Sequence, residues 1–295
     1  MPAEKIPADN KKIPALKNYI EKMPSLPTTV TKIMEIANNP AASPADLNKV
    51  ISLDPVLMGK VMKLINSAYY GLSQEVTSLV RAIIMLGINT VKNLALSTAV
   101  LGSLGSKKNF QALNMEGFWR HSLCVGVTSK LIAKNRGIEQ KHLEEYFIAG
   151  LLHDIGKIPL NNRFDEEFVV AMSISDKDHL PLYRAEQKAF GLDHTDVGCM
   201  IVDAWKLGRD IRDAVGHHHD VEGYDGEYPD IVRAVGISNY FANLYEMGFS
   251  GDRYPEKMDR GVLKDFGVSM DFFDDIEETV REQIEKARIF LQIAA

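Results

Sequence analysis

The chain has 295 residues, of which 45% are apolar and 25% charged, and its net charge is −6. This composition is typical of an ordinary globular protein with one large or two small domains. The mild negative charge and the lack of a basic stripe argue against nucleic acid as a partner. The N-terminus has no signal-peptide core, and polar residues interrupt the most apolar region, 79–104. With only two cysteines, Cys124 and Cys199, we expect a reduced cytoplasmic protein without a membrane span.

The first third of the chain predicts a series of short helices. Residues 28–39 have one apolar face at helical spacing. The next helix begins at Ser43, a good N-cap that is followed by a proline, and should end near Asp54, which precedes another proline. A further helix would run from there to Gly71. Two more segments, 78–87 and 89–102, are apolar on nearly all sides and should be buried helices.

The small, polar segment Leu101–Asn109 is the best candidate for a linker. Helical patterns resume after it, and in the last segment, 271–295, acidic residues precede basic ones, as the helix dipole favours. No stretch alternates with a period of two, so we predict an all-α protein with two lobes. The predicted parts are an N-terminal extension, a helical lobe, a second helical lobe and a C-terminal helical segment, with the bounds 1–18, 19–105, 106–250 and 251–295.

The apolar stretch LLHDIGKIPL places His153 beside Asp154. Burying an acid beside an imidazole costs free energy unless both are paired, and either a metal ion or a hydrogen-bonded core would pair them. A lone histidine is more often a core or surface residue than a ligand, so the pattern of all candidates matters. Imidazole and carboxylate ligands together suit Fe, Mn, Co, Ni or Zn. The residues that would complete such a site are His121, His194, His217 and His218.

The order of these residues resembles the ligand order of the HD superfamily of metal-dependent phosphohydrolases. The motifs HDIGK, HTDVG and AVGHHHDVEGY are similar to those of the HD-GYP branch, which hydrolyses cyclic dinucleotides. In that branch the lysine of the first motif contacts substrate phosphate, which implies a phosphate-binding role for Lys157. The resemblance implies one or two transition-metal ions per chain.

The N-terminal half resembles a more particular family, the HDOD domains, which are HD-related output domains of bacterial signalling proteins. The motifs that carry the resemblance are PSLP, DP, NSAY and LG, which begin at Pro24, Asp54, Asn66 and Leu86. The resemblance covers roughly residues 19–245 and implies a two-lobed helical fold. Many HDOD domains have lost the metal ligands and act by binding partners, whereas this chain keeps most of them.

Two positions depart from the HD pattern. The final aspartate of the metal shell is replaced by Asn239, which brings no negative charge, and the glutamate that adds a third metal in some HD-GYP proteins is replaced by Gly117. We therefore favour a regulatory signal-transduction module that binds signalling proteins, keeps an HD-type metal site and has little or no hydrolytic activity. The alternative is a phosphohydrolase acting on a nucleotide or cyclic dinucleotide, with Asp154 anchoring the metal and Lys157 holding the phosphate. A metal-free scaffold is least favoured, because six buried polar groups make a poor core.

Overall fold

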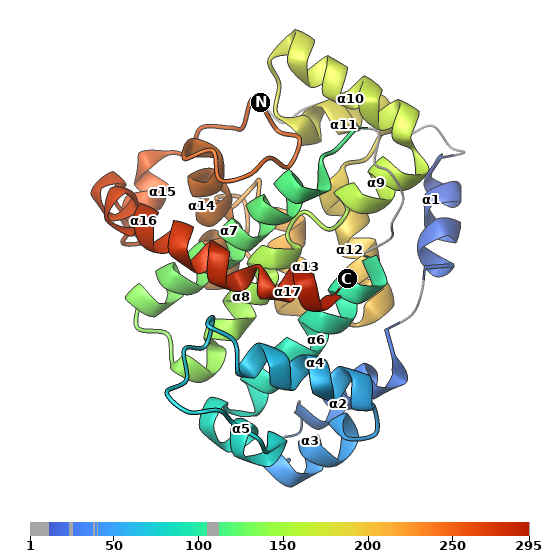
Figure 1. Cartoon of the computed structure of the whole chain (residues 1–295). Coiled ribbons are helices and arrows are strands. Elements are labelled where there is room, and N and C mark those ends of the chain that lie inside the picture. Colours follow the sequence, from blue (N-terminus) through green and yellow to red (C-terminus); the bar gives the residue numbers. More distant parts are fainter. Residues whose placement is uncertain (1–11, 24–25, 38, 40, 105–111, 295) are drawn as a thin grey trace.

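A computed structural model describes residues 12–23, 26–37, 39, 41–104 and 112–294 (Figure 1). All regular elements in these ranges are helices, which confirms the predicted all-α fold. The helices before residue 105 are α1 (Lys12–Glu21), α2 (Thr28–Ala37), α3 (Pro44–Ile51), α4 (Pro55–Ile65), α5 (Leu79–Leu86) and α6 (Ile88–Leu104). Those after it are α7 (Met115–Asn135), the 3-10 turn η1 (Gln140–His142), α8 (Leu143–Leu152), α9 (Lys157–Arg163), α10 (Asp165–Asp178), α11 (Leu182–Phe190), α12 (His194–Trp205), α13 (Arg209–His217), α14 (Pro229–Leu244), α15 (Arg260–Asp265), α16 (Met270–Ala287) and α17 (Ile289–Ala294).

Local capping explains where the short N-terminal helices begin and end. As predicted, Ser43 caps α3, and it forms a reciprocal capping box with Asp46. The predicted end of this helix near Asp54 is confirmed. α3 ends three residues before Asp54, whose carboxylate accepts a hydrogen bond from the Leu57 amide at 2.9 Å and so caps α4. The predicted end of α4 at Gly71 was wrong, because the Asn66 side chain turns away to bond the backbone of the segment before α5.

The apolar helix α6 joins the two lobes. It contacts α2, α4, α5 and α8, which explains why most of its residues are buried. The first residues of the predicted linker, 101–104, belong to α6, and the others, 105–109, lie outside the described residues. Among the described helices none is long and apolar enough by itself to cross a membrane, and only the pair α5 and α6, bent by 115°, passes that test together.

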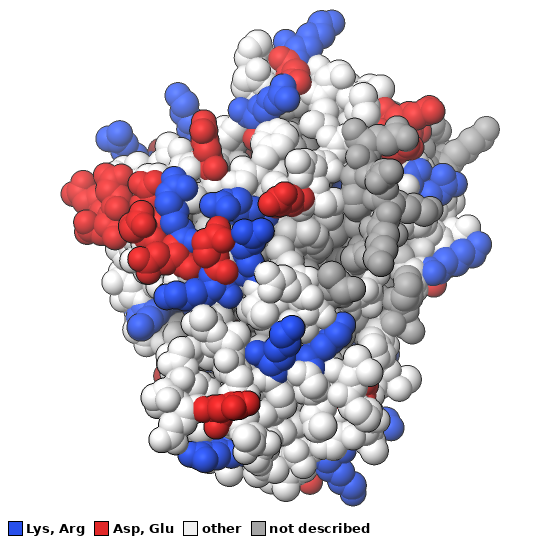
Figure 2. All heavy atoms as spheres, viewed as in Figure 1, with Lys and Arg blue, Asp and Glu red and all other residues white. Residues whose placement is uncertain are grey.

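Both ends of the described chain pack onto the lobes. α1 contacts α9 and α12, and α17 contacts α4 and α6. Tyr69, after α4, packs its ring against Phe147 of α8 and Phe290 of α17, with centroid distances of 5.5 and 5.3 Å. One continuous hydrophobic core therefore runs from the N-terminal helices to the C-terminal ones. Acidic side chains gather on the surface over α15 and α16 (Figure 2), where the predicted acidic start of the last long helix lies.

The second lobe is built around α7 and α8, which lie side by side in the middle of the molecule (Figure 1). They approach closely because glycines face each other: a Cβ on Gly150 would lie 2.8 Å from the Cα of Gly126. A second close approach lies at Gly156, between α8 and α9. A Cβ there would lie 2.0 Å from the carbonyl oxygen of His194 and 2.6 Å from the amide nitrogen of Gly198. The glycine therefore allows the start of α12 to reach the HDIGK motif.

We expect Gly156→Ala to destabilise the protein because the new methyl group meets rigid backbone rather than a flexible side chain. Overpacking of this kind costs about 2 kcal/mol or more, which would lower the melting temperature by roughly 5 °C for a chain of this size. Gly59→Ala is the matched control, since Gly59 lies within α4 with nothing near its Cβ and alanine is the better helix former. Equal melting temperatures for the two variants, measured by calorimetry, would contradict the close packing at Gly156.

Candidate metal centre

The buried carboxylate of Asp154, only 1% exposed, is the centre of the candidate site. One oxygen, Oδ1, lies 3.2 Å from His194 Nε2 and 3.7 Å from His218 Nε2. The other, Oδ2, lies 3.3 Å from His153 Nε2 and 3.9 Å from His121 Nε2. The four histidines come from α7, the end of α8, the start of α12 and the end of α13. Five of the six residues predicted as metal ligands therefore surround one point in the second lobe.

Three of these imidazoles are held in one orientation by hydrogen bonds on their far side. Nδ1 of His153 lies 2.7 Å from the carbonyl oxygen of Gly150, and Nδ1 of His218 lies 2.9 Å from that of Val215. Because a carbonyl oxygen can only accept, Nδ1 of each ring must carry the proton. In the neutral ring the lone pair is then on Nε2, which faces Asp154. Locking of the outer nitrogen is typical of metal-binding histidines.

His194 is oriented by Glu186, a residue that the sequence analysis missed. Glu186 Oε2 accepts hydrogen bonds from both Nδ1 and the backbone amide of His194, at 2.6 and 2.9 Å. Both side chains are fully buried. A signal was present in the sequence, since Glu186 occupies the apolar stripe of α11 between Leu182 and Phe190. An acid at a core position requires a partner.

The three histidines at the end of α13 do not contribute as predicted. His217 faces away from Asp154 and lies against the ring of Tyr224, 5.0 Å between centroids. His219 instead places Nε2 3.1 Å from Nε2 of His194. Consecutive residues in a helical turn point about 100° apart, so three adjacent histidines cannot all face one ion. The prediction that His217 converges on the site was therefore wrong, and His219 takes its place.

The neighbours of Asp154 Oδ2 differ from those of Oδ1. Lys157 is only 2% exposed, and its Nζ lies 2.7 Å from Asp154 Oδ2 and 3.2 Å from the hydroxyl of Ser250. Asn239 lies at the place expected from the HD pattern, with its Oδ1 3.0 Å from His121 Nε2. The predicted phosphate-binding lysine is thus paired inside the protein, and the side of the carboxylate nearest His121 already has a cation and an amide beside it.

The charges in the site follow from burial and from these pairs. Burial raises the pKa of Asp154, but His153 and Lys157 outweigh it, so the pKa lies well below its usual range and the carboxylate is ionised. Burial lowers the pKa of His121 to about 3, and it lowers the pKa of His218 well below its usual range. Burial also acts on His194, but Glu186 outweighs it and the pKa is raised to about 9. A metal ion at His194 would therefore have to displace a proton.

The described residues fit a metal ion. Two groups have ligand atoms within 4.8 Å of one another, one formed by His121, His153 and Asp154 and the other by His194, His218 and His219. One atom that faces the centre, His153 Nε2, has no hydrogen-bond partner among the described residues although it is buried. Such groups are costly unless something pairs with them. A cation between the imidazoles and the carboxylate would do so.

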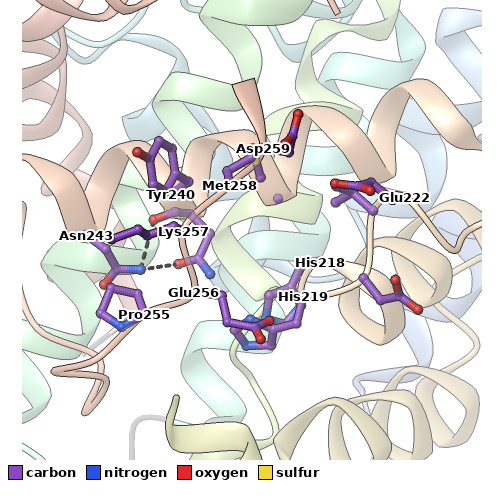
Figure 3. Close-up of a pocket in the computed structure, with 14 residues that line it drawn as sticks. His218, His219, Glu222, Tyr240, Asn243, Pro255, Glu256, Lys257, Met258 and Asp259 are labelled. Carbon is purple, nitrogen blue, oxygen red and sulfur yellow. Dashed lines mark hydrogen bonds between the residues drawn. The ribbon is translucent and has the colours of Figure 1, made fainter. Parts of the chain in front are cut away.

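A cavity of about 340 Å³ opens beside this site (Figure 3). His218, His219 and Asn239 line its inner end. Its other walls carry four carboxylates and one lysine: Asp220, Glu222, Glu256, Asp259 and Lys257. The way to the site is therefore lined mainly by negative charge.

Comparison with known proteins places this geometry in a family. A protein of Treponema pallidum (strain Nichols) is 23% identical over 256 residues, which are 86% of this chain and 48% of that protein, so the chain spans about half the length of this relative. A crystal structure of an HDOD domain protein from Geobacter sulfurreducens is 24% identical, with a TM-score of 0.74 and coverage of 94% of this chain and 97% of that one.

Two further crystal structures share the fold. A Shewanella amazonensis protein provisionally named a phosphohydrolase has a TM-score of 0.70, 20% identity, and coverage of 95% of this chain and 98% of that one. A Marinobacter aquaeolei protein provisionally named a signal transduction protein has a TM-score of 0.74, 21% identity, and coverage of 95% and 61%. The HDOD domain model matches residues 23–221, which confirms the resemblance seen in the sequence. The chain belongs to the HDOD domain family.

Proposed function

We propose that this protein is a regulatory module of bacterial signal transduction that holds one transition-metal ion, hydrolyses phosphodiesters weakly or not at all, and acts by binding signalling proteins. The ion would be bound by Asp154 Oδ1, His194 and His218, whose nitrogen and oxygen ligands suit Fe, Mn, Co, Ni or Zn. Membership of the HDOD family supports the signalling role. The unpaired Nε2 of His153 and the locked imidazoles support the metal.

The observation that carries this proposal is the position of Lys157. Its ammonium group already neutralises Asp154 Oδ2, the oxygen that a second ion would need. A second cation at that oxygen would be repelled by the lysine, and Asn239 supplies no charge to compensate. Two-metal phosphodiester hydrolysis needs both ions to stabilise the attacking and leaving oxygens. The arrangement therefore favours a single ion.

The charges that line the cavity beside the site also argue against phosphodiester hydrolysis. Four carboxylates against one lysine make its walls unfavourable for a phosphodiester, which is itself an anion. Glu256 is paired with Arg184 at the rim, and Glu222 and Asp259 flank the opening (Figure 3). A cyclic dinucleotide would have to enter past these groups.

The alternative function is a metal-dependent phosphohydrolase. It is favoured by the number of retained ligands, four histidines around one aspartate, and by the name of the Shewanella amazonensis relative. A bound metal ion would supply Lewis-acid catalysis and a nucleophile at neutral pH. Lys157 would hold the phosphate only after its bond to Asp154 had broken, which uncovers a buried charge.

The metal content of two variants tests which of the neighbouring histidines His217 and His218 binds the ion. For protein purified without an affinity tag, we expect about one ion per wild-type chain, and at least a tenfold lower affinity in His218→Ala because one of three ligands is lost. His217→Ala is the matched control, since this neighbour faces Tyr224, and its metal content should equal that of the wild type. Elemental analysis by mass spectrometry gives the stoichiometry. Equal metal loss in both variants would rule out the proposed ligand set.

Glu186→Gln tests the group that orients His194. Glutamine keeps a hydrogen-bond acceptor but removes the charge, so we expect metal affinity to fall about 10- to 100-fold while the fold is retained. Competition with a chromogenic chelator measures the affinity, and circular dichroism monitors the fold. The control is Glu166→Gln, an exposed glutamate in the first turn of α10. Unchanged affinity in Glu186→Gln would mean that His194 does not bind the ion.

Asn239→Asp tests why hydrolysis is weak. The new carboxylate would lie beside His121 and compensate the charge of a second ion, so metal content should rise from about one to about two per chain. Hydrolysis of bis(4-nitrophenyl) phosphate should rise with it. The proposal would be overturned by wild-type protein that hydrolyses this ester or a cyclic dinucleotide at roughly 1 per second or faster and loses the activity in His153→Ala.

A further inference from the structure

A second cavity, of about 550 Å³, lies where the two lobes meet. Its walls come from α2 and α6 of the N-terminal lobe and from α8, α13 and α14 of the second lobe. The volume is within the range of small-molecule sites. None of the residues of the candidate metal centre lines it, so it is separate from that centre.

Side chains of opposite charge line this cavity. Lys92 of α6 lines it together with Glu145 of α8 and Asp210 of α13, yet among the described residues Lys92 forms no ion pair. Burial raises the pKa of both carboxyl groups, and Lys92 offsets this only in part from a distance. The one ring nitrogen near Glu145 belongs to His142, 3.2 Å away. The partly buried carboxylates therefore lack a full cationic partner.

Asn93 adds a donor without an acceptor. It lines the same cavity, is 3% exposed, and its Nδ2 has no hydrogen-bond partner among the described residues. An unpaired buried amide is costly, and a group bound in the cavity that Asn93 lines would supply an acceptor. Lys92 and Asn93 are adjacent on α6, so this helix can donate to a carboxylate while α8 and α13 accept from a cation.

We propose that this cavity binds a free basic amino acid, with its carboxylate at Lys92 and Asn93 and its cationic groups at Glu145 and Asp210. The rings of Tyr146 and Tyr228 and the side chains of Met34, Leu207 and Ile211 line the space for the aliphatic part of the ligand. A basic side chain is favoured over a neutral or acidic one because carboxylates outnumber lysines in the walls. Glu227 joins Glu145 and Asp210 against Lys92 and Lys206, while Asp230 is paired with Arg136. This inference goes beyond the proposed function and does not rest on the metal.

Because of where the cavity lies, a ligand bound there would contact two helices that also carry histidines of the candidate metal centre. α8 and α13 pass from the cavity to the candidate metal centre: Glu145 and His153 lie at opposite ends of α8, and Asp210 and His218 lie at opposite ends of α13. Eight residues of helix span about 12 Å. A ligand joining α6 to both helices would fix the N-terminal lobe against the helices that carry the two histidines.

The test is titration calorimetry on the full chain after treatment with a chelator, using arginine, lysine, glutamine, glutamate and agmatine as probes. We expect saturable binding of arginine or lysine, at least about tenfold tighter than that of glutamine or glutamate, because each lost charge-assisted contact weakens binding by about that factor. Agmatine, which lacks the carboxylate, should bind less tightly than arginine. The titration uses chelator-treated protein, so its outcome does not depend on whether the metal proposal holds.

Two variants assign the contacts. Lys92→Met should weaken arginine binding about tenfold and leave agmatine binding unchanged, whereas Asp210→Asn should weaken both. Lys60→Met, which changes a lysine of α4 outside the cavity, should bind arginine like the wild type. The proposal is overturned if neither arginine nor lysine binds, if glutamate binds more tightly than arginine, or if folded Lys92→Met and Asp210→Asn both retain full affinity for arginine.

Discussion

The ionised carboxylate of Asp154 has to be compensated inside the protein, and much of the second lobe is arranged to do this. An unpaired charge in such a place would cost several kcal/mol. The compensation comes from five helices, because the histidines and Lys157 are carried by different elements that meet only at this point. The glycines at the α7–α8 and α9–α12 contacts allow the backbones to approach closely enough for these side chains to meet.

The sequence predicted those features that depend on local pattern or on a motif of adjacent residues. The all-α fold followed from helical spacing, and the pairing of His153 with Asp154 followed from their position in an apolar stretch. The family pattern puts Asn239 in place of the final aspartate of the metal shell, and in the structure Asn239 lies beside His121. In each case the information lies in a short segment or in the order of segments.

The features that the sequence did not predict depend on orientation. Three histidines lie at the end of α13. The exact end of that helix decides which of them faces Asp154, and a sequence defines helix ends only to within a residue or two. Glu186 was missed because its partner, His194, lies on another helix beyond a turn. The pairing of Lys157 with Asp154 rather than with an external phosphate is a matter of side-chain direction, which a motif does not record.

Lys157 affects the stability of the site when metal is scarce. A centre whose only counter-charge is a metal ion tends to open or unfold when the ion leaves, as zinc-dependent folds do. Here the lysine is a counterion that belongs to the chain and cannot diffuse away. The metal-free protein therefore keeps a neutralised interior. The occupancy of the proposed metal site can then rise and fall reversibly with the supply of metal in the cell. Such a centre is suited to reporting a condition rather than to serving as a permanent catalytic part.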